Sequence, residues 1–67
     1  MNLNKEKIYT LVGVYNNRNI FTTLDGEDIH CLTYREYNRY IVGKLSCVNM
    51  RYSFQLNCWI IFQAVLL

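Results

Sequence analysis

Residues 48–66 read VNMRYSFQLNCWIIFQAVL, and every even-numbered position in this stretch is apolar. The odd-numbered positions begin polar, from Asn49 to Asn57, and become mostly apolar from Trp59 onward. Successive side chains of a β-strand point to opposite faces, so this alternation is typical of a sheet with one covered face. Toward its C-terminal end the same stretch becomes apolar on both faces.

The length of this stretch requires a turn. A fully extended segment of this size would span about 60 Å, more than twice the width expected of a compact chain of 67 residues. A two-residue hairpin loop would shift the odd–even phase, and no such shift is present. We therefore predict two strands, about residues 45–54 and 58–66, joined near residues 55–57 by an odd-length connection or a strongly bent strand. The alternative is a helix from about Leu56, with an apolar stripe of Cys58, Ile61, Phe62 and Val65.

The preceding residues predict three more strands and one helix. The segments KIYTLVGVY (7–15), IFTTL (20–24) and IHCL (29–32) are rich in β-branched and aromatic residues. Asparagine-rich residues 16–19 and the Asp-Gly pair at 25–26 suit the hairpin turns between them. Gly13 indicates a bulge or a close backbone approach. Thr33 and Glu36 fit a capping box and Gly43 fits a left-handed residue after a helix, so we predict a helix at about residues 34–42.

The predicted order is strand, strand, strand, helix, strand, strand. This order indicates one small α+β, mostly β domain over residues 1–67, with residues 1–6 frayed. It is also the element order of an oligonucleotide/oligosaccharide-binding (OB) barrel, so we expect a five-stranded, partly open antiparallel barrel or sheet. The resemblance lies in the coarse order and in no residue motif. A small Src-homology-like barrel and an open α+β sheet are the alternatives.

The reactive residues do not assemble an active site. Cys31, Cys47 and Cys58 include no CxxC pair and leave one thiol over in any disulfide scheme, which favours reduced thiols in an intracellular protein. His30 and Cys31 would point to opposite faces of a strand, so they cannot form a catalytic pair. The spacing of the histidine and the cysteines matches no zinc pattern. We therefore expect a non-enzymatic protein that uses no metal or other cofactor.

Charge and hydropathy limit the partners. The formal net charge is +2, and three of the acids lie together at Asp25, Glu27 and Asp28, so we expect only weak affinity for nucleic acid. The apolar end of the chain, residues 58–67, is much shorter than the about 20 residues that a membrane-spanning helix needs. No membrane partner is expected.

Tyrosine and arginine provide the candidate binding residues. Six residues of the chain are tyrosine, and the predicted helix and C-terminal strands carry an alternating set of aromatic and basic side chains. Such residues are enriched at protein–protein hot spots, and they also stack on bases and contact phosphates in single-strand binders. The candidate partner-binding residues are Tyr34, Arg35, Tyr37, Arg39, Tyr40, Arg51 and Trp59.

The first functional hypothesis is a protein-binding module that occupies the surface of another protein. It also accounts for residues 59–67, which are apolar on both faces and hard to bury in so small a domain. A single-stranded nucleic-acid-binding, OB-like module is the alternative. A homo-oligomer that self-associates through residues 59–67 is a third hypothesis. The short length, the absence of proline and the richness in asparagine and tyrosine resemble small accessory proteins of viruses and mobile elements, which suggests an inhibitor of a host protein.

Overall fold

The computed structural model describes residues 2–67. Its elements follow the predicted order: β1 (Tyr9–Tyr15), β2 (Ile20–Thr23), β3 (Asp28–Thr33), α1 (Arg35–Ile41), β4 (Leu45–Ser53) and β5 (Cys58–Leu66). The fold is α+β and mostly β, with one short helix, as expected from the sequence.

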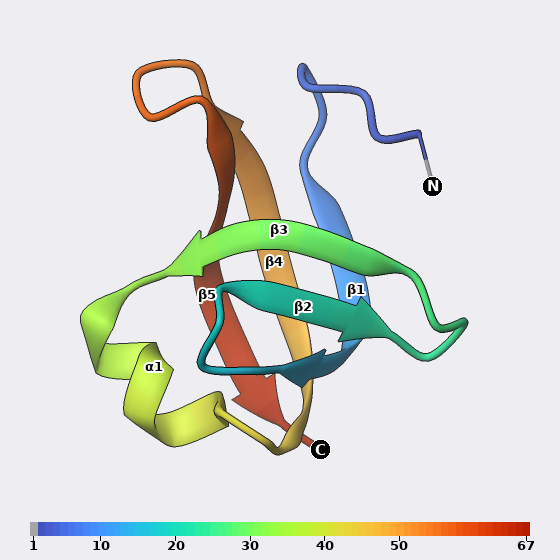
Figure 1. The fold of residues 1–67 in the computed structure, drawn as a ribbon, viewed down its shortest axis with the longest axis vertical. Helices are drawn as coiled ribbons and strands as arrows, with labels where there is room; N and C mark the ends of the chain where they lie inside the picture. The colour runs from blue at the N-terminus through green and yellow to red at the C-terminus, as the bar shows by residue number, and fades with distance from the viewer. Residues whose placement is uncertain (1) are drawn as a thin grey trace.

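The five strands form a ring. They pair in the order β1-β2-β3-β5-β4, and pairing of β1 with β4 closes the ring. Figure 1 shows β1, β4 and β5 as one layer, with the β2–β3 hairpin crossing it. The sheet is mixed and not wholly antiparallel, because β3 and β5 run parallel. The β4–β5 hairpin follows the connection through α1 and returns β5 alongside β3 in the same direction.

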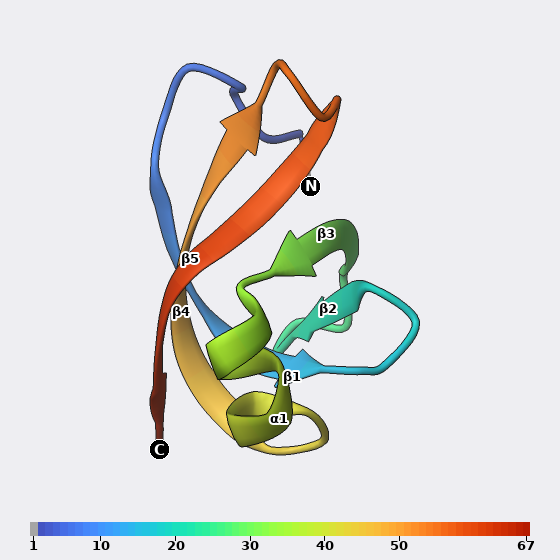
Figure 2. The ribbon, with the colours of Figure 1, turned by 90° about the vertical axis from the view of Figure 1, so that its left-hand side faces the viewer.

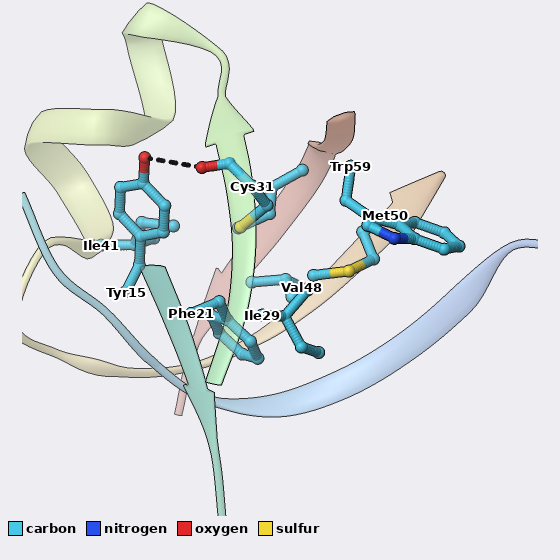
Figure 3. Packing of buried hydrophobic residues seen from close by; sticks show 9 residues of the cluster. Tyr15, Phe21, Ile29, Cys31, Ile41, Val48, Met50 and Trp59 are labelled. Atoms are coloured by element: carbon cyan, nitrogen blue, oxygen red, sulfur yellow. Dashed lines mark hydrogen bonds between the residues drawn. The ribbon is translucent and has the colours of Figure 1, made fainter. Parts of the chain in front are cut away.

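The core fills the ring, and every strand and the helix contribute to it. Phe21, Met50 and Ile61 are fully buried, and α1 contributes Ile41 (Figure 3). The hydroxyl of Tyr15 donates to the Oδ1 atom of Asn19 at 2.8 Å and lies 3.4 Å from the carbonyl oxygen of Cys31. Together these contacts join β1, β3 and the first turn around one apolar centre.

The two predicted C-terminal strands are confirmed, and the alternative helix is wrong. The prediction of an odd-length connection is also wrong: residues 54–57 form a four-residue connection between Ser53 and Cys58, which pair directly. This turn therefore reverses the odd–even phase. A register shift next to Asn49 and Met50 reverses it again, leaving Phe62 as an extra residue in β5. The unbroken even-numbered apolar pattern results from two phase changes that cancel.

The helix is confirmed, but the capping box is wrong. The N-cap residue is Tyr34, and it makes no side-chain capping bond; its carbonyl oxygen instead accepts from the N–H groups of Tyr37 and Asn38, both at 3.0 Å. Thr33 still belongs to β3 and pairs with Ile61. Its hydroxyl oxygen is buried and has no hydrogen-bond partner among the described residues. Because Thr33 has strand geometry, its side chain is not placed to cap α1.

The segment ahead of β1 makes contacts with the core and with β1. Met1, part of the segment expected to fray, lies outside the described residues. Leu3 packs against the core, and the N–H of Asn4 donates to the hydroxyl of Tyr9 at 2.7 Å. Leu3 and Asn4 thus contact the core and β1, and fraying of residues 1–6 stays a prediction.

Candidate interaction surfaces

One groove crosses the outer face of the ring where β3 and β5 run parallel. The strand register places Arg51 of β4 opposite Ile60 of β5, and Ile60 beside Leu32 of β3. These three residues form a lateral row over three strands. We call the surrounding hollow of about 310 Å³ the β3–β5 groove; it is lined by Leu32, Thr33, Tyr34, Arg51, Ser53, Gln55, Leu56 and Ile60.

The groove has an aliphatic floor and polar ends. Ile60 is only 9% exposed at its base, while Leu56 of the β4–β5 turn stands 59% exposed at its rim. Tyr34, at the start of α1, is 46% exposed. Arg51 is exposed, and its guanidinium carbon lies 6.0 Å from the ring centre of Phe62. This combination can receive apolar side chains and place an arginine beside them.

A second hollow continues from Tyr34 along α1. It has a volume of about 590 Å³ and is lined by Tyr34, Arg35, Glu36 and Arg39. Because Tyr34 lines both hollows, Arg35 and Arg39 lie on a surface continuous with the β3–β5 groove. The structure therefore brings four predicted binding residues together: Tyr34, Arg35, Arg39 and Arg51.

The other two tyrosines of the predicted helix surface line a neighbouring hollow, which shares Glu36 with the hollow along α1. Tyr37 and Tyr40 line a different hollow of about 430 Å³, with Glu36 and Ala64. Tyr37 is half-buried and Tyr40 is 44% exposed. The rings of Tyr34 and Tyr37 meet edge to face, 6.2 Å between centres, where the two surfaces adjoin.

The prediction that Trp59 belongs to an exposed binding face is wrong. Trp59 is 9% exposed and is part of the core cluster. Its indole packs edge to face on Tyr9 at 5.7 Å and on Tyr52 at 5.4 Å between ring centres. The four-residue turn before β5 is the reason, because it places odd-numbered Trp59 opposite Tyr52 on the inner face.

A third surface lies on the outer face of β1, β4 and β5. Register pairs Val12 with Cys47 and Cys47 with Val65, and it pairs Val14 with Leu45. The N–H of Leu67 donates to the carbonyl oxygen of Leu45 at 3.1 Å. Val14, Leu45 and Leu67 therefore form a second row beside the row of Val12, Cys47 and Val65. The resulting outer-sheet patch consists of Val12, Val14, Leu45, Cys47, Val65 and Leu67.

The expectation that residues 59–67 form an exposed apolar surface over their whole length is wrong. Residues 59–61 are buried, because β3 pairs with this half of β5. Val65 and Leu67 are 59% and 69% exposed. Within residues 59–67, the exposed large apolar side chains are therefore those of Val65 and Leu67.

The three cysteines differ in burial: Cys31 is buried, whereas Cys47 and Cys58 are partly exposed. All three cysteines are free. Burial raises the pKa of Cys31 from its ordinary 9.0 to about 12, which keeps this thiol protonated at neutral pH. Burial also raises the pKa of Tyr15 from 10.0 to about 12, and charge on Cys31 adds to the effect.

Within residues 2–67, no three side chains of the His, Cys, Asp and Glu types are grouped so that they could hold a metal ion. Over the same residues, the structure has no helix of the length and apolar character needed to cross a membrane.

Sequence reasoning missed the aliphatic part of the groove, namely Leu32, Leu56 and Ile60. No local signal identifies these residues as neighbours, because their proximity depends on the pairing of β3 with β5. Leu56 carried a partial signal as a large apolar residue in a turn.

No protein-family model, curated protein or solved structure matches this chain. Its function is therefore inferred from the geometry and chemistry of these surfaces.

Proposed function

We propose that this chain is a non-enzymatic protein-binding module that receives a short segment of another protein in the β3–β5 groove. The observation that carries the proposal is the row Arg51–Ile60–Leu32, which places an aliphatic floor next to an exposed guanidinium. Apolar pockets with a few oriented polar groups are typical of binding sites. The volume, about 310 Å³, suits a few side chains and not a large ligand.

Charge indicates which segment fits best. Arg35, Arg39 and Arg51 surround Tyr34, and Glu36 is the acidic residue among the linings of the two adjoining hollows. An apolar segment flanked by aspartate or glutamate would therefore match the surface, since arginine binds carboxylates with charge-assisted hydrogen bonds. By occupying that segment, the module would block other contacts of its partner, which is how an inhibitor of this size can act.

Selection from a random peptide library displayed on phage tests the proposal. We expect enrichment of peptides with large aliphatic residues next to acidic ones. The double variant Tyr34→Ala/Arg51→Ala removes a wall and the guanidinium of the groove, and should lose at least about tenfold in affinity for the selected peptides.

The matched control is Arg18→Ala, which removes an exposed arginine from the β1–β2 turn without touching the groove. It should retain the affinity of the original chain. Failure to enrich any peptide, or equal binding by the groove variant and the original chain, would overturn the proposal.

Single-stranded nucleic acid is the second candidate, because the strand and helix order is OB-like and the groove contains Tyr34 and Arg51. Two features make it the weaker one. The groove has only one aromatic ring on which a base could stack. Asp25 and Glu27 in the β2–β3 turn and Asp28 at the start of β3 add negative charge. Fluorescence anisotropy with a labelled oligothymidylate distinguishes the candidates. Binding that falls steeply between about 50 and 200 mM salt would favour this function.

A further inference from the structure

We propose that the open edge of β5, at residues 62–66, is a strand-addition site where an extended segment of another protein pairs with β5 through its backbone. The site is separate from the β3–β5 groove and goes beyond the function proposed for that groove. It rests on the direction of the β5 backbone groups, on the end of β3 partway along β5, and on a hollow between this edge and α1.

The backbone groups of Ala64 and Leu66 point away from β4. The N–H of Leu67 donates to the carbonyl oxygen of Leu45 at 3.1 Å, and the β4–β5 register is unbroken from there back to Gln63. In an antiparallel pair, residues that bond to the neighbouring strand alternate with residues directed away from it. Every second residue from Gln63 to Leu67 therefore bonds to β4, and the N–H and C=O groups of Ala64 and Leu66 face the opposite edge.

Within residues 2–67, no strand pairs with this edge. β3 pairs with β5 only from Trp59 to Ile61. The last bond on this side runs from the N–H of Tyr34 to the carbonyl oxygen of Ile61, at 3.4 Å, and the chain then turns into α1. No other backbone group of the described residues bonds to the open side of Ala64 or Leu66. The edge thus presents two donors and two acceptors at the spacing of a β-strand.

The helix α1 borders this edge and leaves room beside it. Figure 1 shows α1 next to the C-terminal half of β5, on the side away from β4. Figure 2 shows α1 on the same side of the β1, β4 and β5 layer as β2 and β3. Ala64 shares a hollow of about 430 Å³ with Glu36, Tyr37 and Tyr40 of α1. The helix therefore lies along one face of the site without filling it.

The chemistry of the edge determines the occupant. Donors and acceptors at residues i and i+2 of one strand are complementary to the backbone of another strand, which is the basis of β-augmentation. A single extended segment fits beside α1. Two copies of this chain joined antiparallel through these edges would bring both α1 helices over the same joined edges, so the copies would collide. A segment of a different protein is thus favoured over a second copy.

Side chains of the added strand would alternate between two surroundings. Those on the inner face meet Tyr37, Tyr40 and the carboxylate of Glu36. Those on the outer face lie beside Val65, which is 59% exposed. We expect lysine or arginine at an inner position, because a cation can contact both the tyrosine rings and the carboxylate, and apolar residues at the outer positions. This preference differs from the acidic one expected of the β3–β5 groove.

Amide hydrogen exchange measured by NMR tests the open edge. In the free chain, the N–H groups of Ala64 and Leu66 should exchange at least about tenfold faster than those of Gln63 and Val65, because only the latter bond to β4. Equal protection of all four amides would overturn the proposal, since the edge groups would then already have partners.

Selection from a random peptide library displayed on phage tests the occupant. The target is the variant Tyr34→Ala/Arg51→Ala, so that peptides specific for the β3–β5 groove are not enriched. A selected peptide should slow the exchange of the Ala64 and Leu66 amides. Failure to enrich any peptide, or a selected peptide that leaves these two amides unprotected, would contradict strand addition.

N-methylation of the selected peptide tests the backbone pairing. Methyl groups on the alternate amides that face β5 should weaken binding at least about tenfold, whereas methyl groups on the intervening amides should not. Equal effects of the two sets would mean that side chains and not the backbone hold the peptide, and would exclude this mode of binding.

Proline at the end of the edge makes the same test on this chain. Leu66→Pro removes the outward N–H and keeps the β4 pairing of the residues on either side, a position where strands accept proline. Leu66→Ala is the matched control, because it removes the side chain and keeps the N–H. Leu66→Pro should bind the selected peptide at least about threefold more weakly than Leu66→Ala. Equal binding by the two would count against the proposal; if Leu66→Pro does not fold by circular dichroism, the N-methylated peptides decide.

The two sites fail separately. Tyr34→Ala/Arg51→Ala should lose the peptides of the β3–β5 groove and keep those of the β5 edge. Leu66→Pro should lose the edge peptides and keep the affinity of the groove for its own.

Discussion

At the scale of single residues, Thr33 has a buried hydroxyl without a partner in the described structure. Valine has nearly the size and shape of threonine but no hydroxyl group. The substitution Thr33→Val therefore removes the free-energy cost of burying that oxygen. We expect stability unchanged or raised by about 1 kcal/mol, measured by urea denaturation. The capping box read from the sequence predicts the opposite, a loss of about 1 kcal/mol. A clear loss of stability in Thr33→Val would therefore support the capping box and contradict the structure of this turn.

Gly13 is the residue with the least room for a side chain. A Cβ atom there would lie 2.0 Å from the carbonyl oxygen of Thr22, a backbone atom of the paired strand β2. Gly13→Ala should cost at least about 3 kcal/mol, because the two strands must separate to accept the methyl group. Gly26→Ala is the control: its Cβ would meet open space, and its positive φ should cost only about 1–2 kcal/mol. Thermal unfolding of both variants compares the two costs, and equal costs would contradict the close approach.

Because the thiol of Cys31 is buried, we expect the stability of the fold to decrease as the pH rises in the alkaline range. In the unfolded chain this thiol ionises above about pH 9, whereas in the fold its pKa is about 12. Between these values the unfolded state binds fewer protons, so the free energy of unfolding falls as pH rises, by up to about 1.4 kcal/mol per pH unit. Urea denaturation at about pH 8 and about pH 10 measures the loss. Cys31→Ala should have a smaller pH dependence; an equal one would exclude Cys31 as the cause.

At the scale of elements, the β4–β5 hairpin shows what a sequence pattern can and cannot establish. The alternation of residues 48–66 predicted both strands with nearly correct ends. It did not reveal the four-residue turn and the extra residue Phe62, because each reverses the phase and together they leave the pattern unchanged. The inner positions in the first half of β5 are therefore Trp59 and Ile61, where the even-numbered pattern indicated Ile60 and Phe62.

Substitution of two aromatic residues in β5 tests this register. Trp59→Ala should cost about 3–5 kcal/mol, since it empties a core site between Tyr9 and Tyr52. Phe62→Ala should cost clearly less, because Phe62 is only half-buried and lies at the bulge. The denaturation midpoints of the two variants should differ accordingly. The reverse order would mean that the even-numbered residues face the core.

At the scale of the whole molecule, local signals were sufficient for element order and insufficient for the site. Hairpin turns, strand composition and Gly43 after the helix all act over a few residues, and they predicted the succession of elements. Ring closure and the parallel pairing of β3 with β5 join residues far apart in sequence. Those pairings create the β3–β5 groove from Leu32, Arg51 and Ile60, and they bury Trp59, so the site could be predicted only in part.

The same closure leaves the molecule with two separate exposed surfaces. The groove carries arginine and tyrosine beside an aliphatic floor, whereas the outer-sheet patch is apolar and uncharged.

Amide chemical shifts measured by NMR, with the ¹⁵N-labelled chain titrated with a peptide selected from the library, test the groove most directly. We predict that the largest shifts occur at Leu32, Tyr34, Arg51, Leu56 and Ile60. Shifts concentrated instead at Val12, Cys47 and Val65, or spread evenly over the ring, would contradict the assignment of partner binding to the β3–β5 groove.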